Sequence, residues 1–219
     1  MRRYAEQLDF DRIRHGGRRT DAGRKPGPNP RIRHRSRERF SHLVPAHVTI
    51  KVRADVPSLR TVRLVREVER SFARARERGD FRLVHYSLQG NHAHLIVEAE
   101  GGDALGRGMK SLGSRLARAM NRVFGRSGPV LADRYHVRVL RSPREVRNAL
   151  AYVLLNARKH AARAGRTLSR AFRIDPASSG RWFDGWRESA APPPDVSPVA
   201  LARSWLLEVG WKRSGLLSP

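Results

Sequence analysis

The chain has 219 residues, enough for one core of about 100–150 residues with additional segments, and its 45 Lys and Arg against 20 Asp and Glu give a formal net charge of +25. This excess, dominated by arginine, indicates a polyanionic partner such as nucleic acid. The lack of cysteine excludes disulfides, thiolate metal sites and cysteine catalysis, and with neither a secretory signal nor an apolar run near the ~20 residues of a membrane span, we expect a soluble intracellular protein.

Residues 1–44 are predicted to form a basic arm outside the folded domain. Residues 23–30 contain three prolines and two glycines, which interrupt both helices and strands. From Arg31 to Arg39 an arginine stands at every second position, and the mutual repulsion of these charges makes the run a poor core element. The arm is either a DNA-contacting tail or a solvated, disordered leader.

Regular elements are predicted from residue 46 onward. Residues 47–53 alternate between polar and apolar side chains, as a half-buried strand does. An apolar stripe predicts a helix from 57 or 58 to about 78, which Gly79-Asp80 ends. Residues 81–88 and 93–98 read as two further strands joined by a turn at Gly90-Asn91.

Helices and strands also alternate in the second half of the domain. We predict a helix at 104–124, a short strand at 135–140, and a helix that begins at Pro143 after Ser142 as N-cap and ends near His160. The order β-α-β-β-α-β-α is typical of an α+β, ferredoxin-like (split βαβ) antiparallel sheet with helices on one face, here extended by a C-terminal helix that carries a tyrosine. We therefore divide the chain into an arm (1–44), a folded domain (45–165) and an irregular C-terminal extension (166–219).

Two histidines at the start of the third predicted strand are the clearest chemical signal. Side chains at positions i and i+2 of a strand point to the same face, so His92 and His94 can converge on one metal ion while Ala93 faces the core. Without cysteine, the ion must be held by imidazole, carboxylate, amide or water, which favours Mg²⁺ or Mn²⁺, or a metal that imidazole binds well. Two histidines alone do not establish a metal site, and the alternative is that they occur on the same strand by chance.

The last predicted helix offers a polar face next to its apolar stripe. Tyr152 and Asn156 lie one turn apart, so a phenol and an amide oxygen could be presented together. In an amphipathic helix a tyrosine more often sits at the boundary of the core with its hydroxyl in water. The spacing on its own is therefore a weak signal.

Taken together, these segments resemble a known family. The run Asn91-His92-Ala93-His94-Leu95-Ile96-Val97, a basic helix, Asp133-Arg134-Tyr135-His136 and a helix with Tyr-x-x-x-Asn resemble the HUH single-tyrosine transposases. The likeness covers about residues 45–165 and is strongest to the REP-associated tyrosine transposases, whose domain is called IS200-like. Ala93 and Ala157 depart from the family pattern and remove neither a ligand nor the nucleophile.

The resemblance implies a metal-dependent DNA transposase that acts in DNA transposition and recombination of a mobile element. His92, His94 and Asn156 would bind a divalent ion, Mg²⁺ or Mn²⁺, and Tyr152 would attack a phosphodiester in single-stranded or hairpin DNA. The products would be a 5′-phosphotyrosine link and a free 3′-hydroxyl, which can later rejoin strands without a nucleotide cofactor. The enzyme would work in the cytoplasm, associated with the nucleoid, as a monomer or a homodimer.

Basic residues near these elements are candidates for contacts with DNA. The spacing of three arginines in the second predicted helix gives one continuous stripe, for which a solvated helix face is the default interpretation. With a net charge of +25 we favour DNA contact for this set and for four residues elsewhere, the whole group being Arg115, Arg118, Arg122, Arg134, Arg158, Lys159 and His160.

Alternatives to these assignments remain. Tyr135, next to His136, is a second candidate nucleophile, but it lacks an amide four residues later and we expect it to support the sheet edge. The remaining histidines, His47 among them, are expected to be surface or edge residues. At the level of function, a catalytically decayed or domesticated protein of the same fold that binds DNA or RNA without cutting is the alternative. A ribosomal or other RNA-binding domain fits the charge but does not account for His92, His94, Tyr152 and Asn156 together.

Overall fold

The computed structural model describes residues 40–163, 174–188 and 193–219, with side chains undescribed at 157–163. The proline-rich and arginine-rich stretches of the predicted arm lie outside the described residues. The first strand begins at Leu43, four residues before the strand at 47–53 that the sequence predicted.

Five antiparallel strands form one sheet in the order β2-β3-β4-β1-β5, which confirms the predicted α+β class with an antiparallel sheet. Because β4 lies antiparallel to both of its neighbours, β1 and β3 run in the same direction on either side of it. Four strands were predicted, and the two-residue β2 at the edge was not. The strands are β1 (Leu43–Lys51), β2 (Glu77–Arg78), β3 (Phe81–Leu88), β4 (His92–Glu100) and β5 (His136–Val139).

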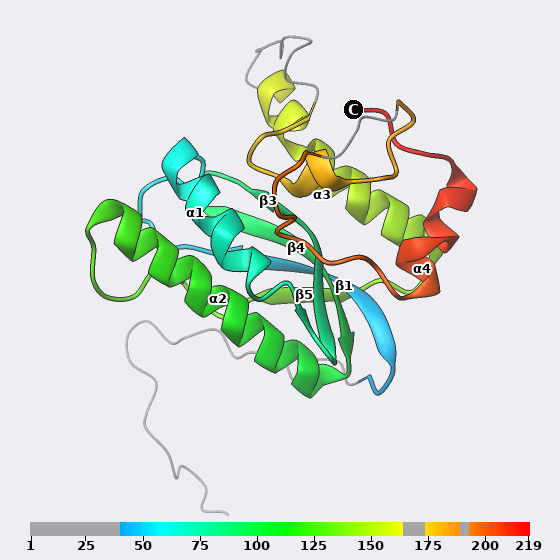
Figure 1. Cartoon of the computed structure of the whole chain (residues 1–219), viewed down its shortest axis with the longest axis horizontal. Helices are drawn as coiled ribbons and strands as arrows, with labels where there is room; N and C mark the ends of the chain where they lie inside the picture. The colour runs from blue at the N-terminus through cyan, green and yellow to red at the C-terminus, as the bar shows by residue number, and fades with distance from the viewer. Residues whose placement is uncertain (1–39, 164–173, 189–192) are drawn as a thin grey trace, which may run out of the picture. The chain divides into compact units, whose positions relative to one another are not determined.

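Helices cover both faces of the sheet, whereas the sequence predicted helices on one face (Figure 1). Helices α1 (Val62–Ala73) and α2 (Gly102–Phe124) share one core with the inward side chains of β1, β3 and β4. Helix α3 (Pro143–Arg163) packs on the other face with Val84 and Ile96. The chain after α3 joins this second core through η3 (Ser179–Trp182), α4 (Trp205–Glu208) and η4 (Gly210–Ser214). None of the helices in the described ranges combines the length and apolar character needed to span a membrane.

Helix α1 is shorter than predicted at both ends. Thr61 caps it, its hydroxyl accepting a hydrogen bond from the Leu64 backbone N–H at 3.4 Å. At the other end, Glu77 and Arg78 leave the helical path and pair with Phe81 and Arg82 as β2. The predicted stop at Gly79-Asp80 is therefore the turn between β2 and β3.

Alanine substitutions at two glycines of α2 should change the free energy of unfolding in opposite directions. A Cβ at Gly108 would overlap the Phe81 ring, so Gly108→Ala should lower the free energy of unfolding by about 1–3 kcal/mol through overpacking. At Gly106 a Cβ would meet no described atom within 4 Å, so Gly106→Ala should raise it by about 0.5–1 kcal/mol through helix propensity. Urea unfolding of the two variants checks the pair, and equal effects would contradict the close packing of α2 on β3.

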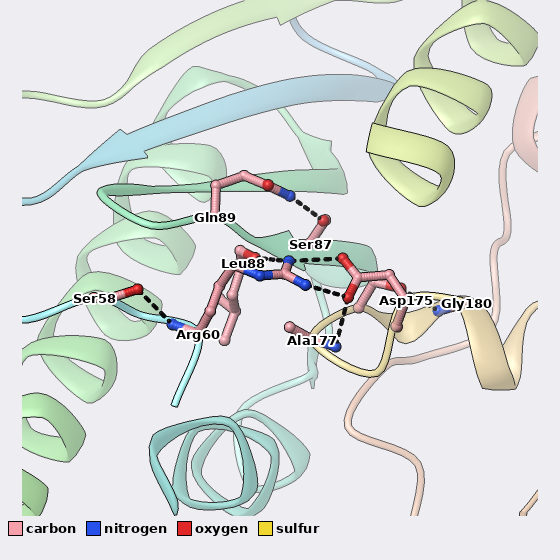
Figure 2. Close-up of polar contacts among 9 residues, drawn as sticks. Ser58, Arg60, Ser87, Leu88, Gln89, Asp175, Ala177 and Gly180 are labelled. Atoms are coloured by element: carbon pink, nitrogen blue, oxygen red, sulfur yellow. Dashed lines mark hydrogen bonds and ion pairs between the residues drawn. The ribbon is translucent and has the colours of Figure 1, made fainter. Parts of the chain in front are cut away.

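The chain after α3 covers the edge of β3 and ties it to the loop before α1. Leu88 donates a backbone hydrogen bond to the Ala177 carbonyl, and Ala200 donates one to the Leu83 carbonyl, each at 2.8 Å. Figure 2 shows Arg60 donating to both carboxylate oxygens of Asp175 at 2.8 Å and to the Leu88 carbonyl at 2.9 Å. The described part of the extension is thus a component of the fold.

The second core contains a histidine that burial keeps neutral. His85 lies against the Phe183 ring and within 3.2 Å of the Ser179 hydroxyl, and burial lowers its pKa to about 4. In the unfolded chain His85 takes up a proton near pH 6.5, whereas in the folded chain it stays neutral until the pH falls to about 4. Stability contributed by the neutral ring is therefore present above pH 6.5 and lost as the pH falls toward 4.

The expected loss is about 1.4 kcal/mol per pH unit for each such histidine in this window. His47, whose pKa is also lowered to about 4, makes the second contribution. His85→Gln keeps a polar partner for Ser179 and should reduce the slope of stability against pH by about half. Urea unfolding at pH 7, 6 and 5 measures this slope, and an unchanged slope in the variant would show that folding does not lower the pKa of His85.

Candidate active site

His92 and His94 lie together on the α3 side of the sheet. Their Nε2 atoms are 3.0 Å apart and their rings are nearly perpendicular, with 4.6 Å between the centroids. Ala93, between them, is fully buried in the core on the α1 and α2 side. The alternation of side chains along β4 therefore gives the convergence that the sequence predicted for the pair.

Hydrogen bonds at the opposite nitrogens orient both rings. His92 Nδ1 is 2.8 Å from Asn91 Oδ1, which can only accept, so the proton of His92 is on Nδ1. His94 Nδ1 is 3.2 Å from both the Thr49 hydroxyl and His47 Nε2. Burial, with the positive charge of Arg138, lowers the pKa of His47 to about 4, so at neutral pH its Nε2 can accept the His94 proton. These contacts allow tautomers in which both Nε2 atoms are acceptors, the state in which they can bind a metal ion, whereas a direct Nε2–Nε2 hydrogen bond at 3.0 Å requires a proton on one of them.

That geometry suits two ligands of one metal ion. Ligands at right angles around an octahedral ion with bonds of about 2.1 Å lie about 3.0 Å apart. In metal sites the second ring N–H of a histidine ligand characteristically donates a hydrogen bond to a neighbouring acceptor. Nδ1 of His92 has such a neighbour in Asn91, and Nδ1 of His94 has one in Thr49. The described residues contain no cluster of three or more His, Asp and Glu side chains placed to hold an ion. A third protein ligand in the described part of the chain would therefore be an oxygen of another kind, such as that of an amide.

Helix α3 brings Tyr152 to the histidines. Val146, Leu150 and Val153 are fully buried against the sheet, as the apolar stripe predicted. The Tyr152 ring stands edge-on to His94, with 5.0 Å between centroids, and lies 5.7 Å from His47. Its side chain is 39% exposed. The phenol is thus accessible to a large substrate next to the imidazole pair.

Asn156, one turn after Tyr152, is buried, with 3% of its surface exposed. Its amide nitrogen is fully enclosed and makes no hydrogen bond within the described part of the chain. Leaving a buried amide unsatisfied costs about 1–3 kcal/mol, so this position calls for a polar neighbour. The unsatisfied atom is a donor and needs an acceptor, whereas a metal ion would bind the amide oxygen of Asn156, so its role as third ligand stays a prediction.

The sequence analysis missed residues of β1 and β5 that complete this surface. His47 was expected to be a surface or edge residue, and the structure corrects this, since it contacts both His94 and Tyr152. Pairing across β3, β4, β1 and β5 aligns Ser87, His94, Thr49 and His136 in one row on the same face. Two basic residues share this face, Lys51 opposite His92 and Arg138 opposite His47.

His47 gives a prediction about metal affinity. Removing the acceptor for His94 Nδ1 should leave the ring less firmly oriented, so His47→Ala should weaken Mn²⁺ binding about 10-fold or more. Isothermal titration of the variant and the unmodified chain measures the change, and His42→Ala provides a control at an exposed histidine. Equal affinity in all three proteins would show that His47 does not support the pair.

The structure separates several predicted DNA-contacting residues from this surface. Arg115, Arg118 and Arg122 lie on α2, on the opposite face of the sheet. Arg115 reaches the Ser71 carbonyl at 3.5 Å and Arg122 pairs with Glu67, so both contact α1. Arg134 is exposed in the loop before β5. The side chains of Arg158, Lys159 and His160 lie outside the described residues.

The other tyrosines are placed away from the imidazole pair. Tyr135 is partly buried against the core formed with α1 and α2. Tyr86 is fully buried, and its hydroxyl donates to Glu69 at 3.0 Å. Burial raises the pKa of Tyr86 well above its usual value, which makes it a poor nucleophile. Tyr152 is therefore the tyrosine next to His94 among those that the structure describes.

Comparison with known proteins finds similarity at the level of structure. No family model matches the chain, and no curated protein matches it. A REP-associated tyrosine transposase bound to a REP hairpin is similar with a TM-score of 0.46 and 17% identity, over 59% of this chain and 74% of that one. A candidate transposase from Deinococcus radiodurans is similar with a TM-score of 0.37 and 14% identity, over 63% of this chain and 100% of that one. At these scores the functional assignment depends on the site itself.

Proposed function

We propose that this chain is a metal-dependent transposase-type endonuclease and strand transferase that cleaves and rejoins single-stranded or hairpin DNA through Tyr152. The observation that carries the proposal is the 5.0 Å contact between the Tyr152 and His94 rings, next to a 3.0 Å pair of imidazole nitrogens. The strand order, with β1 and β3 on either side of β4, supports a ferredoxin-like fold for the domain. A nucleophile and a metal-ligand pair on one surface is the arrangement that phosphoryl transfer requires.

In this proposal His92, His94 and Asn156 hold a divalent ion, Mg²⁺ or Mn²⁺. When bound, the ion supplies positive charge that polarises the scissile phosphate and stabilises its transition state. Tyr152 Oη attacks the phosphorus as the bond to the 3′-oxygen breaks, which leaves a 5′-phosphotyrosine and a 3′-hydroxyl. The phenol proton passes to solvent, to which the half-exposed side chain is open. His47 and Thr49 keep the His94 ring in position through its Nδ1.

Charge supports DNA as the partner. Lys51 and Arg138 lie on the same sheet face as the imidazole pair, and both are exposed. Arg138 donates a hydrogen bond to the Glu145 carboxylate at 2.8 Å, while Lys51 is directly opposite His92. With a net charge of +25, the chain is attracted to a phosphate backbone. A DNA substrate would place the activity in the cytoplasm, at the nucleoid.

The test is covalent capture of DNA. The full chain is incubated with a 5′-labelled or 3′-labelled hairpin that has single-stranded flanks, with Mn²⁺ or with EDTA, and run on a denaturing gel. We expect a protein adduct that carries the 3′ label only and forms only with Mn²⁺. A salt-dependent shift on a native gel with no adduct for any hairpin would instead identify a binding protein of the same fold.

A further inference from the structure

A groove of about 690 Å³ lies on the opposite face of the sheet from Tyr152, between α1 and the segments 176–182 and 195–196. This size is within the range of about 300–1,000 Å³ that small-ligand sites occupy. We call it the Arg66 groove, after the arginine of α1 that lines it. The proposed transposase site uses none of its residues, so its chemistry needs a separate explanation.

Four arginines and two carboxylates line the Arg66 groove, and the carboxylates are already engaged. Glu69 accepts hydrogen bonds from Arg181 at 2.8 Å and from the Tyr86 hydroxyl, and Asp195 is 4.0 Å from Arg181. Arg60 is paired with Asp175, and Arg70 makes a 3.4 Å contact with Glu67. Arg66 is exposed and has no ion pair within the described ranges. The groove therefore has net positive charge and an available guanidinium.

Unsatisfied donors indicate the polarity of the missing partner. Arg181 Nε and Trp182 Nε1 are buried and have no hydrogen-bond acceptor among the described residues. Both atoms can only donate, so a group in the groove could satisfy them by supplying acceptors, as phosphates and base carbonyls do, once the two side chains turn toward it. The Arg181 guanidinium lies over the Trp182 ring at 4.0 Å, which presents a flat cationic surface to the groove.

The rim of the groove is apolar. Val62 and Val196 line it and are 68% and 76% exposed. The basic surface continues across α1, where Arg66 and Arg70 also line a second hollow of about 510 Å³ with Arg63 and Arg122. A partner that matches both hollows has a flat, partly apolar group with acceptors, attached to an extended polyanion. Unpaired nucleotides of a single strand have these properties.

We infer that the Arg66 groove binds an unpaired nucleotide of single-stranded DNA, with its base against Arg181 and Trp182 and its phosphates along Arg66 and Arg63. The choice of DNA rather than RNA rests on the proposed function. The site is separate from the imidazole pair, so a strand bound here can be held while another segment reaches Tyr152.

Binding of fluorescein-labelled dT12 by fluorescence anisotropy tests this inference. The measurements use the full chain with Tyr152→Phe and EDTA, so that no cleavage can occur and a failure of the proposed chemistry cannot affect the result. We expect Arg66→Ala and Trp182→Phe each to weaken binding by about fivefold or more at constant salt. Arg78→Ala is the matched control, since Arg78 is exposed on β2 and lines neither hollow, and it should change affinity by less than about twofold.

An abasic 12-mer separates base from phosphate recognition. Trp182→Phe should have little effect on its binding, while Arg66→Ala should weaken it as it weakens dT12. Urea unfolding of Trp182→Phe shows whether the variant is folded. Equal losses for Arg66→Ala and Arg78→Ala would overturn the inference in favour of nonspecific attraction. Unchanged dT12 affinity in both groove variants, with tight binding of an acidic peptide, would also overturn it and identify a protein partner.

Discussion

Tyr152→Phe is expected to abolish the covalent adduct with hairpin DNA, with a loss of at least about 10³-fold in the rate of its formation. The substitution removes the only oxygen that can join the phosphorus and keeps the ring that packs at 5.0 Å from His94. Loss of a nucleophile from a preorganised site has effects of this size or larger, because the remaining groups stabilise a transition state that can no longer form. The labelled adduct on a denaturing gel, followed over time, measures the rate.

Two variants make this result specific. Tyr135→Phe should leave the adduct intact, because Tyr135 packs against the opposite core. Noncovalent binding of the hairpin should be almost unchanged in Tyr152→Phe, since its charge is unaltered. If the adduct persists in Tyr152→Phe and disappears in Tyr135→Phe, the nucleophile has been assigned to the wrong tyrosine.

Arg60→Ala is expected to lower the free energy of unfolding by about 3–5 kcal/mol. Asp175 has only 2% of its side chain exposed, and Arg60 donates to both of its oxygens (Figure 2). Removing the arginine leaves a buried carboxylate whose remaining hydrogen bond among the described residues comes from the Ala177 backbone N–H, and breaking a buried pair on one side has costs of this order. The Leu88 carbonyl loses a donor at the same time.

Urea unfolding measures the effect, with two comparisons. Arg60→Lys should be intermediate, because an ammonium group cannot reproduce the two parallel hydrogen bonds of a guanidinium. Arg53→Ala breaks the ion pair with Asp55, in which both side chains are about half exposed, and should leave the unfolding midpoint unchanged. A loss for Arg60→Ala no larger than that for Arg53→Ala would mean that the extension is not anchored through Asp175.

The elements with local signals were predictable from the sequence. Strand β3 has the predicted bounds, and α3 begins at the predicted Pro143, because strand propensity, proline and an N-cap act within a few residues. Residues 47, 49 and 51 also alternate in the sequence, so the polar face of β1 was readable. That this face meets His94 was not, because register between distant strands is set by the whole sheet.

The C-terminal extension shows the opposite case. Its aromatic residues have no helical or strand period, yet Phe183, Trp186 and Trp211 are buried together on the α3 side. The Phe183 and Trp211 rings stack at 5.4 Å although 28 positions separate them. Contacts of this kind follow from tertiary packing and leave no pattern within a sequence window. The anchoring of this segment by Asp175 is likewise a long-range effect.

The most direct test of the proposed metal site is a Mn²⁺ titration followed by paramagnetic broadening of the histidine imidazole resonances. Bound Mn²⁺ should broaden His92 and His94 first, at less than one equivalent, with His47 next because it contacts His94. Exposed His42, which precedes the end of β1 that pairs with Glu100 and so lies about 20 Å along the strands from His94, should stay sharper under the same conditions. His94→Ala should abolish the selective broadening. Uniform broadening of all histidines, or none at one equivalent, would contradict a divalent ion held beside Tyr152.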